Sequence, residues 1–349
     1  MKYNTPLPNR MLRHLLLSAS LLALTTTPAT AQQRDSTQTN WLPKISGTVR
    51  AKVECQTEEG ESRFEVRNAR VALDGMLGRW VEYKGEIDLS DEGKIKMLDA
   101  YAGILPTDDW KVRLGQMRVP FSTDAPRSPH VQWFANRSFI AKQVGNVRDV
   151  GIYAGYTLPG GKLKAEGGMY NGSGLTDQAD YWTKEFNFSA RLTWKPLKAL
   201  MLQGSVQKIS PPVGKVYLYD GSVTLTLGRW QLEGEYLRKE YAHNHAPSVN
   251  AWNAMARYTQ PLRGVLPQIA ALCRFDGMGK HCDGSVNELG EAKITDAARK
   301  RLTAGVTLTL PPKTHAEVRL NYEKYFYTHP ELAKRSERDK VVLELMVHF

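Results

Sequence analysis

The chain has 349 residues, a formal net charge of +11 and only three cysteines. No segment offers the ~20 consecutive apolar residues of a transmembrane helix, and three cysteines are too few for a disulfide framework, so both classes are excluded. The moderate excess of base suits anionic solutes, anionic lipid headgroups or nucleic acid.

The first 31 residues have the pattern of a secretory signal peptide. Three basic residues precede an apolar stretch at 15–24, and Ala29-Thr30-Ala31 supplies small residues for cleavage before Gln32. We therefore expect residues 1–31 to be removed on export and 32–40 to form a short polar lead. Export argues against nucleic acid as a partner.

Beyond this lead, apolar and polar side chains alternate along the chain. The clearest segment is 81–89, where an apolar face carries Val81 and Leu89 and the other face carries a charge at every position. The same period of two returns in 186–195 and 301–310. This period predicts strands with two different faces. No linker or charge block divides residues 41–349, so we predict one domain.

Sixteen strands are expected. They lie near 45–55, 63–75, 79–90, 94–105, 110–117, 149–158, 162–170, 186–195, 199–208, 215–227, 229–241, 251–260, 268–275, 300–310, 314–326 and 339–349. Tight turns alternate with longer connections, of which the longest are 118–148, 171–185, 242–250, 276–299 and 327–338. This alternation of short turns and long loops is typical of an outer-membrane barrel and is not expected of a soluble β-sandwich. The predicted fold is an all-β, transmembrane, antiparallel up-and-down barrel of about sixteen strands.

A strand-built membrane protein must close on itself. An open sheet in hydrocarbon would leave unpaired backbone groups, each costing several kcal/mol. Charges at every second position must then face the lumen, because Lys or Arg against lipid near the midplane costs roughly 2–4 kcal/mol. We therefore expect a wet lumen, with outer-membrane lipid and lipopolysaccharide around the wall.

The cysteines leave two alternatives open. Cys273 and Cys282 flank a turn-rich stretch at 274–281 and could form one disulfide, with Cys55 unpaired, or all three could be free thiols. A metal site of Cys273, His281 and Cys282 lacks a fourth ligand and the usual spacing. No metal site is predicted.

The end of the chain resembles the last strand of outer-membrane proteins in general. Apolar residues alternate there from Val341 to Val347, and the final residue is Phe349. In such proteins the assembly machinery recognises this strand, so the resemblance implies a bacterial outer-membrane location.

Four motifs near the front point to a family. They are Phe64-Glu65-Val66-Arg67-Asn68-Ala69-Arg70, Tyr83-Lys84-Gly85-Glu86-Ile87-Asp88, Leu98-Asp99-Ala100-Tyr101 and Arg113-Leu114-Gly115-Gln116-Met117-Arg118-Val119-Pro120-Phe121-Ser122. Together they resemble the phosphate-selective porin O and P family, most sharply over 63–122. That resemblance implies a sixteen-stranded channel, commonly trimeric, with a long third loop folded into the lumen.

Loop 118–148 is the candidate constriction. Its five bases outnumber the single acid Asp124: Arg118, Arg127, Arg137, Lys142 and Arg148. Such an excess in a narrow lumen raises the local concentration of anions, and arginine matches two phosphate oxygens at once. The alternative is that these bases brace the loop against acids of the wall. Four aromatic residues of the loop, Phe121, Trp133, Phe134 and Phe139, are expected to pack it against the wall.

Three more bases share the inward phase of their strands: Arg70, Arg113 and Arg191. They could extend a basic path, but acids such as Glu82 and Glu86 share that phase. These acids weaken the expectation of a continuous basic ladder.

The function predicted is a porin of a Gram-negative outer membrane, in which small solutes diffuse passively through a water-filled channel. Small anions, phosphate among them, are the expected solutes, so the porin serves ion transport. The alternative is a binding or adhesion barrel that uses loops 276–299 and 327–338. No catalytic motif or cofactor-binding glycine loop occurs in the sequence, so neither an enzyme nor a cofactor is predicted.

Overall fold

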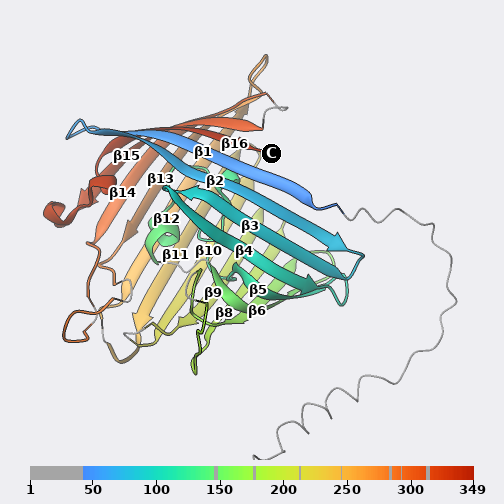
Figure 1. Cartoon of the computed structure of the whole chain (residues 1–349). Helices are drawn as coiled ribbons and strands as arrows, with labels where there is room; N and C mark the ends of the chain where they lie inside the picture. The colour runs from blue at the N-terminus through green and yellow to red at the C-terminus, as the bar shows by residue number, and fades with distance from the viewer. Residues whose placement is uncertain are drawn as a thin grey trace, which may run out of the picture. The chain divides into compact units, whose positions relative to one another are not determined.

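The computed structural model describes residues 42–349 except 145–147, 176–177, 212–213, 245, 283–284, 292 and 312–314. The predicted signal peptide and the polar lead lie outside the described residues. Sixteen antiparallel strands form one closed barrel, in which each strand pairs with its neighbours in the sequence and β1 pairs with β16 (Figure 1). This confirms the predicted fold.

The strands have the following bounds: β1 Lys44–Gln56, β2 Ser62–Leu77, β3 Val81–Asp91, β4 Lys94–Ile104, β5 Trp110–Arg118, β6 Arg148–Thr157, β7 Leu163–Tyr170, β8 Asn187–Leu197, β9 Leu200–Ile209, β10 Val216–Leu227, β11 Trp230–Tyr241, β12 Val249–Pro261, β13 Gln268–Met278, β14 Arg299–Thr309, β15 Ala316–Tyr327 and β16 Lys340–His348. The predicted bounds of most strands are right to within two residues. No described helix is long and apolar enough to cross a membrane.

The period of two produces the two faces of the wall. In β3, Glu86 and Asp88 point inward and are buried, whereas Leu89 points outward and is half exposed. Outward aromatic residues gather where the short turns lie, as in the ring pairs Trp110 with Tyr156 and Trp230 with Tyr258. Such aromatic girdles lie at the membrane interface in barrels of this kind.

Connections at one end of the barrel are short, and most at the other end are long. Three connections at this second end are no longer than those at the first: β1 to β2, β9 to β10, and β3 to β4, which is a two-residue turn of Glu92 and Gly93 that both have positive φ. Glycine adopts this conformation without a Cβ penalty. The five longer connections expected from the sequence are all found at this end of the barrel.

The seam between the first and last strands is closed by the terminal aromatic residue. Phe349 donates its backbone N–H to the oxygen of Gly47 and accepts from the Gly47 N–H. A Cβ at Gly47 would lie 2.3 Å from the Phe349 ring, so the ring occupies the space that glycine leaves. The seam thus requires a small residue at position 47.

The connection between β5 and β6 folds into the barrel. We call its described part, 119–144, the lumen loop; it includes the short helical turns η1 (Pro129–Val131) and η2 (Ile140–Val144), which the strands enclose in Figure 1. Arg118 and Arg148, expected at the ends of this loop, are instead the last residue of β5 and the first of β6.

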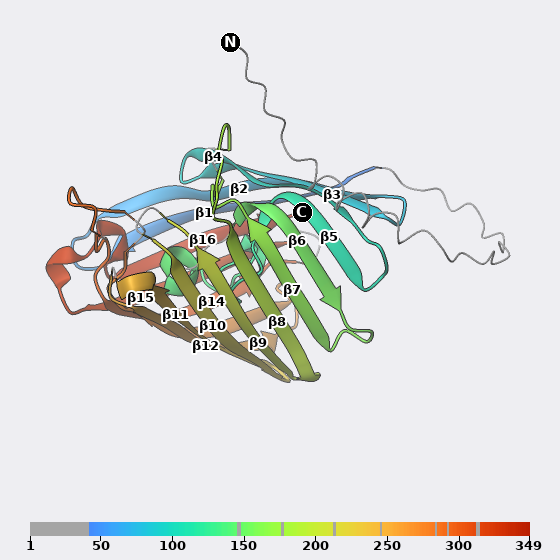
Figure 2. The same ribbon diagram turned by 90° about the horizontal axis from the view of Figure 1, so that it is seen from below.

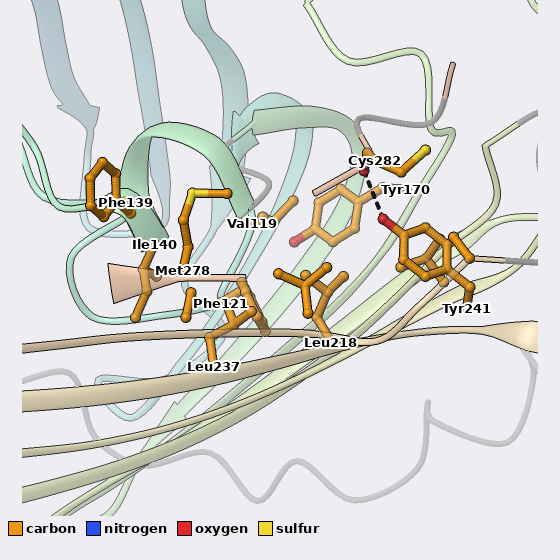
Figure 3. Close-up of a cluster of buried hydrophobic side chains, with 14 of the residues drawn as sticks. Val119, Phe121, Phe139, Ile140, Tyr170, Leu218, Leu237, Tyr241, Met278 and Cys282 are labelled. Atoms are coloured by element: carbon orange, nitrogen blue, oxygen red, sulfur yellow. Dashed lines mark hydrogen bonds between the residues drawn. The ribbon is translucent and has the colours of Figure 1, made fainter. Parts of the chain in front are cut away.

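An apolar cluster fixes the lumen loop from within (Figure 3). Phe121 and Ile140 of the loop pack with the inward residues Leu218 and Leu237, and all four are fully buried. These inward positions are apolar, unlike the charged inward face of β3. The reason is local, because the wall there contacts the lumen loop rather than water.

Candidate functional site

Hydrogen bonds with wall side chains hold one side of the lumen loop against β1 and β13–β15. Arg50 donates to Glu344 at 2.6 Å on the wall and to the carbonyl oxygen of Ala135 in the loop at 2.5 Å. The backbone N–H of Phe139 donates to Asp276 at 3.1 Å. This side of the lumen is therefore filled.

A second carboxylate anchors the start of the lumen loop. Glu235 of β11 accepts hydrogen bonds from the Ser122 hydroxyl at 2.5 Å and from the Thr123 N–H at 2.7 Å. Arg127 is paired with Glu233 of the same strand at 2.6 Å. The loop therefore extends from β5 across to β11.

Between the lumen loop and strands β5–β8 a pocket of about 470 Å³ is left open. Strands β5–β8 lie side by side in the wall (Figure 2). The pocket's charged lining is one acid, Glu166, and six bases: Lys111, Arg113, Arg118, Arg127, Lys164 and Arg191. We call this space the basic pocket. It includes four of the eight predicted anion-binding residues.

Two lysines are the bases of the pocket most open to water. The exposed fraction is 36% for Lys111 and 42% for Lys164. Lys164 lies 2.8 Å from Glu166, and Lys111 lies 3.5 Å from Glu82. These acids orient the lysines without covering them.

Sequence reasoning missed both lysines. Lys111 shares the inward phase of Arg113, and Lys164 shares that of Glu166, so the alternation itself could have found them. What it could not show is that the lumen loop leaves this part of the wall uncovered.

Three of the predicted arginines meet at one carboxylate of the wall, Glu86. Arg70, Arg118 and Arg148 each place a guanidinium nitrogen 3.5–3.9 Å from one oxygen, Oε1 of Glu86. We call these four residues the Glu86 cluster. Arg118 belongs to both groups, so the cluster adjoins the basic pocket.

Arg137 contacts the lumen loop itself. Its guanidinium donates to the carbonyl oxygens of Ala125 at 2.8 Å and Arg127 at 3.0 Å. Burial and nearby arginines lower the pKa of Arg137, whereas the charge of Asp124 raises it. Arg137 thus braces the loop, which is the alternative role considered for these bases.

Lys142 lies apart from the other predicted bases, with its Nζ 3.9 Å from Glu337 and 42% of its side chain exposed.

The expectation for the loop aromatics is confirmed. Phe121, Phe134 and Phe139 are at most 2% exposed and Trp133 is 7% exposed, so all four pack rather than face solute.

The predicted disulfide is not formed, so the alternative of free thiols is correct. Cys273 points outward from β13 and is exposed, whereas Cys282 is buried in the following loop. The Cys282 carbonyl oxygen accepts a hydrogen bond from the Tyr241 hydroxyl at 2.7 Å (Figure 3). The two thiols therefore lie on different sides of the wall. Among the described residues no group of His, Cys, Asp and Glu could hold a metal ion.

Comparisons with known proteins agree with this architecture. The model of the phosphate-selective porin O and P family matches residues 48–210, which confirms the resemblance. No curated protein sequence matches the chain.

Three solved structures illustrate the similarity of fold. OmpF of Salmonella typhi in complex with daunomycin has a TM-score of 0.60 at 10% identity, covering 88% of this chain and 97% of its own. The trimer form of OmpT of Vibrio cholerae has a TM-score of 0.58 at 10% identity, covering 88% and 98%. The outer membrane channel DcaP of Acinetobacter baumannii has a TM-score of 0.58 at 13% identity, covering 88% and 97%.

Proposed function

We propose that this sixteen-stranded barrel of the bacterial outer membrane, whose residues 48–210 match the phosphate-selective porin O and P family, is a porin. Small anions diffuse through it passively. The family match favours a channel over an enzyme. The observation that carries the anion preference is the basic pocket, where six bases and one acid line the space beside the lumen loop.

The preference follows from electrostatics. A permeating ion passes close to the exposed amino groups of Lys111 and Lys164, and a narrow wet space with low-dielectric walls strengthens the field of such charges. The acids that contact the bases reduce this field without cancelling it. We therefore propose moderate selectivity for anions, with phosphate among the solutes.

The test is the reversal potential of the purified protein in a planar bilayer under a potassium chloride gradient. We expect steady conductance and a chloride permeability above that of potassium, with phosphate able to replace chloride as the carrier. A larger potassium permeability would contradict the anion preference. Lack of conductance would contradict the channel and favour the adhesion barrel.

We also propose that three copies assemble as a homotrimer. Outward residues of β16, β1 and β2 line a groove of about 390 Å³: Ala51, Val53, Phe64, Val66, Leu343 and Leu345. Phe64 is 88% exposed, far more than its neighbours. Association within a bilayer is driven by close packing rather than by removal of apolar surface from water, and the projecting ring of Phe64 beside this groove makes the face suitable for packing against a second copy.

Phe64→Glu is expected to convert the trimer to monomers, because a charge replaces the apolar contact on each subunit. Size-exclusion chromatography with light scattering in mild detergent measures the result. Leu192→Glu is the matched control, since Leu192 is also outward and half exposed but lies on β8. If both variants lose the trimer equally, or if both keep it, Phe64 does not lie at the centre of the interface between subunits.

A further inference from the structure

The Glu86 cluster holds three arginines that come from three parts of the chain. Arg70 belongs to β2, Arg118 ends β5 and Arg148 begins β6. Two of them are oriented by acids other than Glu86: Arg70 Nε donates to Asp88 at 2.9 Å, and Arg148 Nε donates to Asp99 at 2.7 Å. Arg118 is oriented by the carbonyl oxygen of Pro126.

The remaining guanidinium nitrogens are directed to one point. Nη1 of Arg70 lies 3.6 Å from Glu86 Oε1, Nη2 of Arg148 lies 3.5 Å from it, and Nη2 of Arg118 lies 3.9 Å from it. At such lengths these contacts are ionic rather than hydrogen-bonded. The two nearer nitrogens are buried and have no hydrogen-bond partner among the described residues.

Three convergent, preoriented guanidinium groups are a binding geometry for an oxyanion. In this chain the place of that oxyanion is held by a carboxylate tethered to β3. The other oxygen of Glu86 forms an ion pair with Lys84 at 3.0 Å, which keeps the side chain turned toward the arginines. Glu86 therefore competes with any anion that leaves the basic pocket past Arg118.

We propose that Glu86 is a specificity-determining residue of the pore, because its carboxylate occupies the site where Arg70, Arg118 and Arg148 would otherwise retain a permeating oxyanion. This inference rests on the proposed anion channel. A conducting site must bind weakly enough to release its ion. The tethered carboxylate meets that need by keeping the three arginines partly neutralised.

The test is block of the chloride current by inorganic phosphate in planar bilayers. Glu86→Gln keeps the volume of the side chain but removes its charge, so the phosphate concentration for half block is expected to fall about tenfold, the effect of one charge-assisted hydrogen bond. Adding Arg148→Gln to this variant should restore the wild-type sensitivity. Glu86→Asp, which retracts the carboxylate, should be intermediate and serves if Glu86→Gln does not fold.

Glu317→Gln is the matched control. Glu317 is another inward acid paired with an arginine, Arg319 at 2.7 Å, but it lies on β15. If phosphate blocks Glu86→Gln no better than Glu317→Gln, the role of Glu86 is refuted while the anion preference of the wild type stands. A wild-type preference for cations would instead refute the proposed function.

Discussion

Glu344→Ala is expected to destabilise the barrel by about 3–5 kcal/mol, the usual cost of removing one partner from a buried ion pair. Glu344 is fully buried and pairs with Arg50 at 2.6 Å and Arg319 at 3.0 Å. Without it, two buried guanidinium groups lose a shared counterion. Arg50 also donates to Gln132 and Ala135 of the lumen loop, so the loop loses an oriented anchor.

Two measurements check this prediction. Urea unfolding in detergent micelles reports the stability, and single-channel recording reports the conductance, which should rise and become noisier as the loop leaves the wall. Glu317→Gln removes a charge that contacts Arg319 but not the loop, and it should leave the conductance near the wild-type value. Unchanged conductance in Glu344→Ala would mean that Arg50 does not hold the loop through Glu344.

The architecture of the wall could be predicted because each strand carries its own two-faced pattern. In β3 the charges at 82, 84, 86 and 88 must all face inward once the other face meets lipid, whatever the rest of the chain does. Such local information needs no knowledge of distant partners. The strand number and most strand bounds follow from it.

The path of the lumen loop could not be predicted in the same way. Its position depends on pairs far apart in sequence, such as Arg50 with Ala135 and Ser122 with Glu235. Leu218 and Leu237 are apolar residues at inward positions, and their burial is explained only by the packing of Phe121 in the same cluster. The bases of the loop looked equivalent in sequence, yet Arg127 lines the basic pocket and Arg137 braces the loop.

The same limit applies to the charge of the pore. Counting bases in the loop overstated its field, because Arg127 is paired with Asp124 at 3.4 Å and with Glu233 at 2.6 Å. Lys111 and Lys164, which no loop count includes, are less covered. Selectivity therefore depends on which bases keep access to water, and this is a property of the packed structure.

Neutralising three bases of the pocket is expected to reverse the selectivity. The variant Lys111→Gln, Lys164→Gln and Arg191→Gln leaves Arg113, Arg118 and Arg127. Five acids contact the pocket's bases in the wild type, and all are retained: Glu82, Glu86, Asp124, Glu166 and Glu233. The local charge thus changes from net positive to net negative, and cations should become the favoured ions.

The expected size follows from Coulomb's law. A unit charge about 8 Å from a permeating ion contributes about 0.5 kcal/mol at the dielectric constant of water, so three charges change the local concentration of each ion by about tenfold. Anions and cations change in opposite directions, so the permeability ratio changes by on the order of a hundredfold before screening by salt. Reversal potentials at low and high salt measure the effect, which should shrink at high salt because the Debye length falls from about 10 Å at 0.1 M to about 3 Å at 1 M.

A matched control carries three neutralisations outside the pocket, at Lys198, Arg229 and Lys300. Lys198 and Arg229 lie in short turns, and Lys300 points outward from β14, so all three are exposed and none lines the pocket. This control should keep the wild-type preference for anions. If it shifts the reversal potential as far as the pocket variant does, the selectivity arises from the overall charge of the barrel rather than from the space beside the lumen loop.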